Sequence, residues 1–582
     1  MIADPLARTS ILPEPDLPSG KNLLAEGRSL ARDWQVGPSA FLNHVGETSE
    51  AAFKRRSVAD GRIMRHGQIG FRDFEKSLRC YHEIWETCDR AGARVDRYGI
   101  TLDWAMGYPL EMRNAGPRGT GMWLESPEQF ADLTSQAPVA PHFGDWVLGF
   151  PAAVTNTCWA LAAGCTSIGN LGQIFTFRLP DWDDDVTSIA ETVKALGLIA
   201  AQPVDVLVHA NLDDGFAATF QDLASCLGAA LIERHIVEGL IGGSMAHCYG
   251  HHYSEPVSRM AFHFALADGA TAPGSMVYGN TTAYRGDESQ NYASLAGYLL
   301  TDILGQQAMP SGHAINPVPV TENERIPDIG EVVAAQLFAD RLIEQAEGLA
   351  PLCDVDAARA EAARIVAGGR AFRDRVLTGL ADRGYDTTCP FELFLALRRI
   401  GARRLEMMFG GHQPVSASPV KRELDAMAAQ RLDQIDMGVR DLIKTAGLQA
   451  MVATSDVHEH GKTLLETMCG ELGVGTLDGG LSVDPDDLVT SAIDSGCDLL
   501  CISTYNGVAL SYVSAVLDDL ATRGAEIPVL IGGRLNQIPA ASNTSLPVDV
   551  TTEVSAKGAV VCADALDMVP ILEKLAAAAV RA

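Results

Sequence analysis

The sequence lacks the features that mark membrane and secreted proteins. No window of about eighteen or more uninterrupted apolar residues occurs, so we expect no membrane-spanning helix. Residues 1–18 are polar and proline-bearing, without the apolar core of a secretory signal peptide. The twelve cysteines form no Cys-x-x-Cys pair and lie mostly in apolar runs, a pattern typical of reduced thiols. We therefore expect a cytoplasmic protein.

Basic residues are too few for a nucleic-acid-binding surface. The chain has 45 Lys and Arg against 74 Asp and Glu, a formal net charge of −29 at pH 7. Binding to phosphates requires a basic surface, so we expect no nucleic acid as partner. At 582 residues the chain exceeds what a single hydrophobic core supports, which predicts two large domains and a short arm.

The first 420 residues are predicted to form the arm and the larger domain. Residues 1–55 carry several prolines and little periodicity, and we interpret them as an N-terminal arm that wraps a neighbour or a second subunit. We expect a homodimer. From 56 to 420, strand-like runs alternate with helical patterns, which predicts a parallel α/β architecture and favours a (β/α)8 TIM-like barrel. The helical patterns lie at 73–91, 151–163, 185–199, 216–230 and 257–267, and the strand-like runs at 168–170, 204–209, 229–232 and 274–278.

The most informative motif of the chain is Asp456-x-His458-x-x-Gly461. An apolar run at 448–454 precedes it and a helix-like stretch at 463–468 follows, so the motif occupies a loop at the carboxyl end of a strand. Doubly wound folds bind cofactors at such loops. A histidine supplies a nitrogen ligand to a metal, and a carboxylate two residues earlier can accept the proton of the other ring nitrogen. The pattern predicts a metal-containing cofactor.

Two later elements extend this motif. Residues 498–504 read as a buried strand ending in the hydroxyls of Ser503 and Thr504, and 528–533 as a strand ending in Gly532 and Gly533. In this order, the three elements resemble the cobalamin-binding domain, with Tyr505 where that family usually has leucine. The resemblance covers about 130 residues. It implies a flavodoxin-like cobalamin-binding domain at 447–582, joined to the barrel by a helical linker at 421–446.

The same resemblance implies roles for these residues. His458 would be the lower cobalt ligand in the base-off/His-on mode, with Asp456 as its hydrogen-bond partner. The displaced nucleotide tail would lie against Gly461, the stretch Ser503, Thr504 and Tyr505, and the pair Gly532 and Gly533. For Ser503 the alternative from the residues alone is a hydroxyl that caps the next helix.

The predicted barrel at 56–420 then indicates which kind of cobalamin protein this is. The barrel is distantly similar to the catalytic subunit of glutamate mutase, and methyleneglutarate mutase joins a related barrel to a cobalamin domain in one chain. The similarity rests on stretches at 64–67, 164–172, 175–180, 267–278 and 303–310, the last with one additional residue. It implies an adenosylcobalamin-dependent radical isomerase that catalyses a 1,2-group migration in a small carboxylic acid or a derivative. A corrinoid methyltransferase and a non-catalytic cobalamin carrier or sensor remain alternatives.

Four residues of the barrel are candidates for the substrate site. Arg65 can anchor a carboxylate through a bidentate fork, or form a structural salt bridge. His247 and Tyr249 belong to the proton-exchanging stretch 247–253, which falls where the similar barrels face substrate. His209, with Asn211 and Asp213, follows a strand, and barrel active sites lie at strand carboxyl ends. An N-cap role for Asp213 or Asp214 is the competing interpretation.

Overall fold

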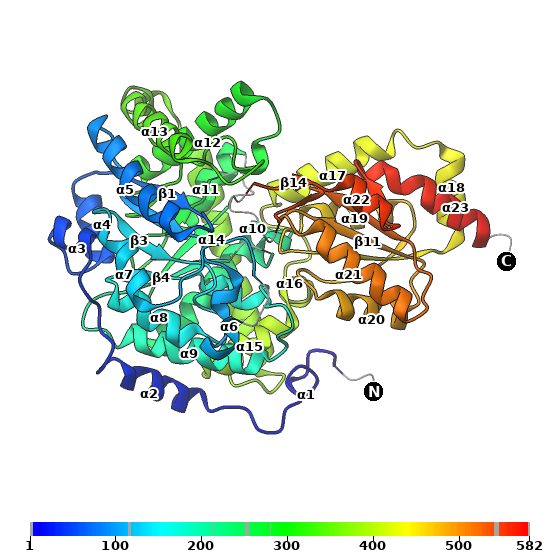
Figure 1. Cartoon of the computed structure of the whole chain (residues 1–582), viewed down its shortest axis with the longest axis horizontal. Coiled ribbons are helices and arrows are strands. Elements are labelled where there is room, and N and C mark those ends of the chain that lie inside the picture. The colour runs from blue at the N-terminus through cyan, green and yellow to red at the C-terminus, as the bar shows by residue number, and fades with distance from the viewer. Residues whose placement is uncertain are drawn as a thin grey trace. The chain divides into compact units, whose positions relative to one another are not determined.

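A computed structural model describes residues 4–114, 118–212, 215–250, 255–279, 281–539 and 546–579. It divides into two compact units (Figure 1). Unit 1 comprises Met1–Phe175 and Trp182–Pro419, and unit 2 comprises Thr176–Asp181 and Val420–Ala582. Each unit has hydrophobic core clusters of its own.

Strands and helices alternate through the middle of unit 1, with helices alone at both ends. Its strands are β1 (Met64–Ile69), β2 (Arg97–Ile100), β3 (Ala140–Phe143), β4 (Ser167–Ile168), β5 (Leu207–Asn211), β6 (Ser244–Tyr249), β7 (Met276–Val277) and β8 (Ala314–Ile315). Its helices are α1 (Arg8–Ile11), α2 (Gly20–Leu30), α3 (Ala40–Val45), α4 (Glu50–Ala59), α5 (Phe74–Arg90), α6 (Leu110–Arg113), α7 (Pro127–Ser135), α8 (Ala153–Ala162), α9 (Asp185–Ala200), α10 (Leu223–Arg234), α11 (Pro256–Ala267), α12 (Glu288–Ala308), α13 (Ile329–Leu349), α14 (Asp356–Ala381), α15 (Pro390–Ile400) and α16 (Ala402–Phe409).

The strands of unit 1 form two parallel sheets with the orders β3-β2-β1-β8 and β4-β5-β6-β7. The edge strands meet as well, since β3 contacts β4 and β7 contacts β8. The strands therefore follow one another in chain order around a ring, and the helices lie outside them (Figure 1). Parallel sheets within an α/β fold are confirmed.

The helix boundaries follow local capping. Asp73 accepts a hydrogen bond from the Lys76 N–H and starts α5, and Asp184 accepts one from Thr187 and starts α9. The predicted helices at 73–91 and 185–199 are thus confirmed. The predicted strand at 229–232 is wrong, because this apolar run lies inside α10, a helix buried on nearly all sides. A helix without a polar face has the same apolar pattern as a buried strand.

Residues 4–60 contain four helices, and these pack on the rest of unit 1 in the same chain. Helix α2 packs against α9 and α3 contacts β3. The buried carboxylate of Glu50 in α4 lies 2.7 Å from the Lys54 ammonium and 2.9 Å from the Arg97 guanidinium on β2. This segment therefore differs from an arm reserved for a second subunit, since it supplies charged groups to the interior of its own unit.

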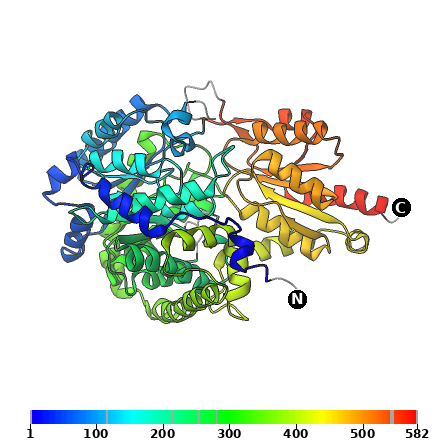
Figure 2. The same ribbon diagram turned by 90° about the horizontal axis from the view of Figure 1, so that it is seen from below.

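Unit 2 is a smaller α/β unit whose helices lie on both faces of its sheet (Figure 2). Its elements are α17 (Pro419–Leu432), α18 (Met437–Ala446), β9 (Gln449–Thr454), α19 (His460–Glu471), β10 (Gly475–Asp478), α20 (Pro485–Ser495), β11 (Leu499–Thr504), α21 (Ala509–Thr522), β12 (Val529–Gly533), β13 (Asn536–Gln537), β14 (Val548–Asp549), α22 (Thr551–Ala556), β15 (Val560–Cys562) and α23 (Val569–Ala579). The main sheet is parallel with the order β10-β9-β11-β12-β15, the strand order of flavodoxin-like folds.

Alternating strand residues supply two separate cores in unit 2. Ala450 and Val452 of β9 pack with α17, α18, α19 and α23, whereas Met451 and Ala453 pack with α20, α21 and α22. A strand that is covered on both faces is expected to be apolar throughout, which explains the uninterrupted apolar runs near 448–454 and 498–504. Helices α17 and α18 contribute to the first of these cores. Residues 421–446, predicted as a helical linker, are therefore packed as part of unit 2.

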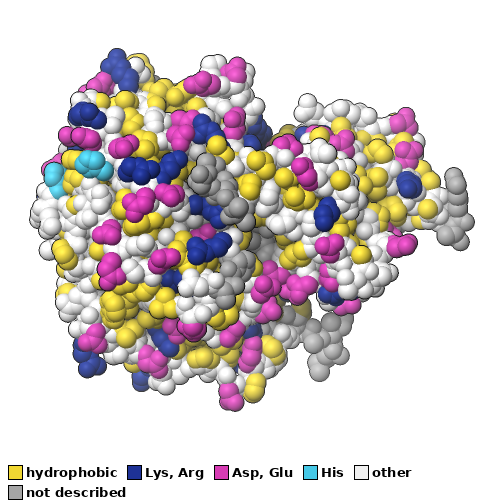
Figure 3. Space-filling view, in the orientation of Figure 1, with side chains coloured by type: hydrophobic (Ala, Val, Ile, Leu, Met, Phe, Trp, Pro, Cys, Tyr) yellow, Lys and Arg dark blue, Asp and Glu magenta, His cyan; other side chains and the backbone are white. Residues whose placement is uncertain are grey.

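The surface agrees with the acidic composition. Figure 3 shows acidic side chains spread over the visible face among basic and apolar ones. Among the described residues, none of the helices has the length and apolar character that a membrane crossing needs.

Candidate functional site

The loop after β9 is organised by the carboxylate of Asp456. Its Oδ1 accepts hydrogen bonds from the backbone N–H of His458 (2.9 Å) and from His458 Nδ1 (2.7 Å). Its Oδ2 accepts from the backbone N–H groups of Tyr505 (2.7 Å) and Asn506 (3.1 Å), which follow β11. Burial alone raises the pKa of Asp456, but the His458 charge and these hydrogen bonds outweigh it and lower the pKa. The carboxylate thus joins two loops and stays ionised.

His458 is held by one ring nitrogen and reaches solvent. Its side chain is 39% exposed, whereas the side chain of Asp456 is 7% exposed. With Nδ1 bonded to Asp456, coordination of a metal would use Nε2 on the other side of the ring. The Tyr505 ring lies beside the imidazole, with centroids 4.6 Å apart, and Arg534 stands over the Tyr505 ring at 5.5 Å. The loop presents an oriented and accessible imidazole.

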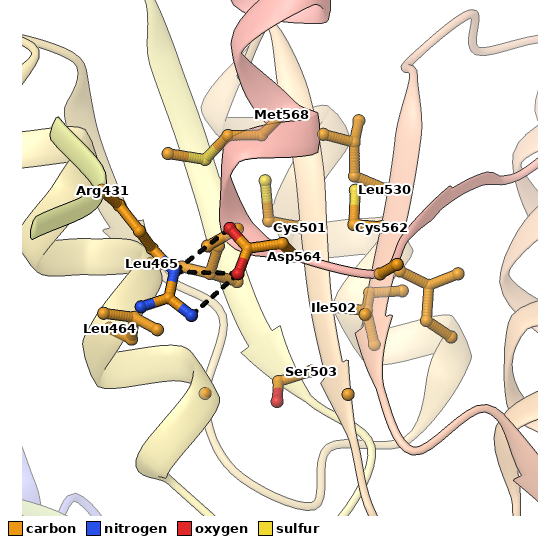
Figure 4. A pocket seen from close by; sticks show the side chains of 16 residues that line it. Arg431, Leu464, Leu465, Cys501, Ile502, Ser503, Leu530, Cys562, Asp564 and Met568 are labelled. Atoms are coloured by element: carbon orange, nitrogen blue, oxygen red, sulfur yellow. Dashed lines mark hydrogen bonds and ion pairs between the residues drawn. The ribbon is translucent and has the colours of Figure 1, made fainter. Parts of the chain in front are cut away.

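A cavity of about 190 Å³ opens between α19 and the carboxyl ends of β11 and β12 (Figure 4). Four residues predicted to hold the nucleotide tail line it, namely Gly461, Ser503, Gly532 and Gly533. Its remaining wall is largely apolar and includes the sulfur-bearing side chains of Cys501, Cys562 and Met568. The predicted residues come from three elements separated in sequence, and the fold brings them to one cavity.

Two glycines that line this cavity occupy positions without room for a side chain. A Cβ at Gly461 would lie 2.2 Å from the Ser503 hydroxyl oxygen. A Cβ at Gly533 would lie 2.3 Å from the Thr504 carbonyl oxygen, and its φ of +101° is itself unfavourable for other residues. The backbone at these positions can therefore be approached closely. The neighbouring hydroxyl of Thr504 is buried and accepts a hydrogen bond from Ser455 at 2.8 Å, so it orders the loop.

The sequence motifs missed one polar pair at the cavity. Arg431 of α17 forms a bidentate ion pair with Asp564, with Nη2–Oδ2 at 2.7 Å, and both side chains line the cavity (Figure 4). They lie outside the three motif elements, and no spacing in the sequence connects a helix before β9 with a loop after β15. Only the packing of α17 on unit 2 reveals the pair.

Comparisons with known proteins agree with this site. Residues 449–555 match the family model of the B12 binding domain. Among solved structures, the chain is similar to the crystal structure of a cobalamin-binding protein from Desulfitobacterium hafniense, with 21% identity, coverage of 27% of this chain and 78% of that chain, and a TM-score of 0.19. The comparison with curated proteins found no match. The B12 match spans β9 to α22, so unit 2 carries a cobalamin-binding domain and the protein is corrinoid-dependent.

The described residues fit such a cofactor. The histidine is oriented by a carboxylate, and the cavity is lined at Gly461 and Gly533 by backbone that has no room for a Cβ. The cofactor form and the reaction are not fixed by unit 2, because B12-binding domains occur in isomerases and in methyltransferases.

Contacts divide the strand residues of unit 1 between an inner face and an outer face. Arg65 of β1 lies on the outer face, where its guanidinium forms an ion pair with Asp340 of α13. This pairing is the structural salt bridge and does not favour the predicted role as substrate anchor. The next residue, His66, lies on the inner face, where its Nδ1 is 3.1 Å from Nη1 of Arg97.

His247 and Tyr249 of β6 also lie on the outer face. Nε2 of His247 is 3.0 Å from the Glu233 carboxylate, and the Tyr249 hydroxyl donates to the Cys226 carbonyl at 2.9 Å, both on α10. Burial raises the pKa of Glu233 and lowers that of His247, so both groups are neutral. Their contacts with the helix layer do not favour the predicted catalytic roles. Residues 251–253 of the same stretch, with Asp213 and Asp214, lie outside the described residues.

His209 of β5 is the predicted residue that lies on the inner face. Its ring centroid is 4.6 Å from that of His142 on β3 and 5.8 Å from that of His313, which directly precedes β8. Burial, reinforced by the nearby charges, lowers the pKa of all three imidazoles well below 6.5. The sequence reasoning missed His142 and His313. The only signal for them was a histidine within or beside a short apolar run, which is too common to use.

Proposed function

We propose that the protein is an adenosylcobalamin-dependent carbon-skeleton mutase, an isomerase acting on a small carboxylic acid or a derivative. The strands of unit 1 would form a closed (β/α)8 barrel whose inner face holds the substrate. Unit 2 would hold the cofactor with its base displaced by His458. Adenosylcobalamin supplies a carbon-centred radical when its cobalt–carbon bond breaks homolytically.

One observation carries this proposal. Eight parallel strands in chain order, with contacting edge strands, accompany a B12-binding domain in the same chain. A closed barrel excludes water from its interior, which a radical reaction needs. The inner face carries buried imidazoles, a form of polar lining that orients a substrate by hydrogen bonds.

Electron spin resonance of the full-length protein with adenosylcobalamin tests the reaction. We expect a cobalt(II) signal that increases when a substrate acid is added, and exchange of isotope between the substrate and deoxyadenosine. Candidate acids are screened for this exchange. Formation of methylcobalamin from a methyl donor, without any radical signal, would show a corrinoid methyltransferase instead.

The same spectra test the cobalt ligand. In protein labelled with ¹⁵N-histidine, the nitrogen coupling of the cobalt(II) signal should change relative to ¹⁴N. The variant His458→Gly should lose this coupling, whereas His460→Gln, two residues further at the start of α19, should keep it. Unchanged coupling in His458→Gly would refute the assignment of His458.

A further inference from the structure

The inner face of unit 1 contains buried imidazole nitrogens that have no hydrogen-bond partner. Within the described residues, Nε2 of His209 and both ring nitrogens of His313 are buried and unpartnered. The two residues are 4% and 1% exposed, so bulk solvent does not satisfy them. Buried polar groups without partners are rare and cost free energy, and at a functional site they indicate a missing ligand.

The hydrogen bonds around His209 determine which ring nitrogen carries the proton. Oδ1 of Asp145 accepts from Asn170 Nδ2 and from Gln173 Nε2, each at 3.0 Å, which fixes the orientation of the Asn170 amide. The Asn170 Oδ1 must then accept from His209 Nδ1, at 2.9 Å. Since the buried imidazole is neutral, its Nε2 bears a lone pair. His209 therefore needs a hydrogen-bond donor from its ligand.

The His313 ring can donate a hydrogen bond to the same ligand group that donates to His209. A neutral imidazole always has one N–H and one lone pair, and neither nitrogen of His313 has a partner. With the two ring centroids 5.8 Å apart, a single hydroxyl between the rings can donate to His209 and accept from His313. An N–H donor of an ammonium cannot accept in this way.

The buried charges below the histidines also discriminate between ligands. Lys54 and Arg97 share the single carboxylate of Glu50, which leaves one net positive charge. The remaining donors of Arg97 are engaged as well, by His66 Nδ1 at 3.1 Å and the Ser167 hydroxyl at 3.2 Å. This positive cluster favours a carboxylate or another electron-rich acyl group over an ammonium in its own neighbourhood. The Asp145 carboxylate lies apart from it, where it accepts hydrogen bonds from Asn170 and Gln173.

We propose that His209 and His313 form a subsite for the hydroxyl group of a small hydroxy acid or its acyl derivative. The identification of this ligand as the substrate rests on the proposed function, but the binding itself does not. His209 is the acceptor, His313 the donor, and Asn170 with Asp145 positions the His209 ring. The class of substrate differs from the amino dicarboxylates of the glutamate enzyme.

Three probes of one carbon skeleton test this subsite, namely 2-hydroxybutyrate, 2-aminobutyrate and butyrate. They are titrated to about 50 mM, above the millimolar dissociation constants of weak small ligands. The readout is the set of imidazole nitrogen signals of the full-length protein labelled with ring-¹⁵N histidine. His209→Gln and His313→Gln assign the two signals of interest, and His247→Gln is the control for a buried histidine on the outer face.

We expect 2-hydroxybutyrate to shift the signals of both His209 and His313 and to bind about tenfold or more tightly than butyrate. This preference should vanish in His209→Gln and His313→Gln and persist in His247→Gln. Equal binding of the hydroxy acid and butyrate, tighter binding of the amino acid, or unchanged signals with all three probes would overturn the proposal. In the last case a buried water fills the space. The titration needs no adenosylcobalamin, so its outcome is independent of the cobalt(II) test of the mutase.

Discussion

The Asp456 loop of unit 2 and the inner face of unit 1 differ in how far their polar groups have hydrogen-bond partners. Asp456 accepts hydrogen bonds from five donors, including His458 Nδ1 and the backbone N–H of Tyr505. By contrast, within the described residues the inner face leaves three nitrogens of His209 and His313 without partners. A site for a resident cofactor can be fully ordered in advance, whereas a site for a transient substrate keeps unsatisfied groups until the substrate arrives.

The largest expected effect concerns the cobalamin site of unit 2. In Gly533→Ala the new methyl group meets the Thr504 carbonyl oxygen at 2.3 Å, and neither backbone can yield without breaking the β11–β12 pairing. We expect a loss of about 3 kcal/mol in the free energy of unfolding, together with weaker cobalamin binding. Urea unfolding and an absorbance titration with cobalamin measure the two effects.

The matched control is Gly470→Ala in α19. No atom lies within 4 Å of a Cβ built there, and the residue is helical, so stability should be unchanged or higher by about 0.5–1 kcal/mol. Equal stability of the two variants would contradict a tightly preformed cavity.

The second prediction compares two buried histidines of unit 1. His247→Phe leaves the Glu233 carboxyl buried without its partner and should destabilise the protein by about 2 kcal/mol. His313→Phe removes two unpartnered nitrogens, so the protein should be equally stable or more stable. Thermal or urea unfolding measures both. A large destabilisation by His313→Phe would mean that its nitrogens are already satisfied, which would remove the contrast between the two sites.

The third prediction is a pH dependence. Burial, assisted by the charges of Lys54 and Arg97, lowers the pKa of His313 well below 6.5, so the native imidazole is neutral. In the unfolded chain the same ring takes up a proton as the pH falls below 6.5. The unfolded state then binds more protons, and stability declines with falling pH by up to about 1.4 kcal/mol per pH unit for each such histidine.

His313→Phe removes one of these protons, so unfolding curves at about pH 7.5 and 5.5 should show a shallower decline for the variant. Parallel curves for the variant and the natural protein would show that His313 is not held neutral. Gly470→Ala provides the control, because it changes no titratable group and should leave the slope unchanged.

The smallest expected effect is at Tyr505. Its ring packs beside the His458 imidazole at 4.6 Å, where the related domains usually have leucine. Tyr505→Leu removes an aromatic contact of about 0.5–1 kcal/mol, so cobalamin should bind two- to fivefold more weakly. The nitrogen coupling of His458 should persist, because Asp456 still holds the ring. Loss of the coupling would show that Tyr505, in addition to Asp456, sets the ligand orientation.

The cofactor site could be predicted from sequence because its chemistry is local. Asp456 and His458 are two residues apart, and the loop between a buried strand and a helix brings their side chains together. Ser503 and Gly533 end the next two strands of a parallel sheet, so their positions at the same edge followed from the strand order. The Arg431–Asp564 pair depends on packing between distant segments and had no such signal.

The substrate site could not be predicted in the same way. The strands of unit 1 are buried on both faces, so they lack the alternation that reveals which face a residue occupies. A shift of one residue separates outer-facing Arg65 from inner-facing His66. Only the contacts with helix α10 place His247 on the outer face, and only ring contacts across the interior place His209 with His313.

The position of Glu50 has a consequence for where the chain can be shortened. A protein that begins at β1 would retain Arg97 in the interior but lose the carboxylate that neutralises it, and an unpaired buried charge costs about 3–5 kcal/mol. The helical segment before β1 therefore supplies the negative charge that pairs with Arg97 inside unit 1. This segment also leaves the ribosome before β2 does. The Glu50 carboxylate is therefore already present when Arg97 is synthesised and becomes buried.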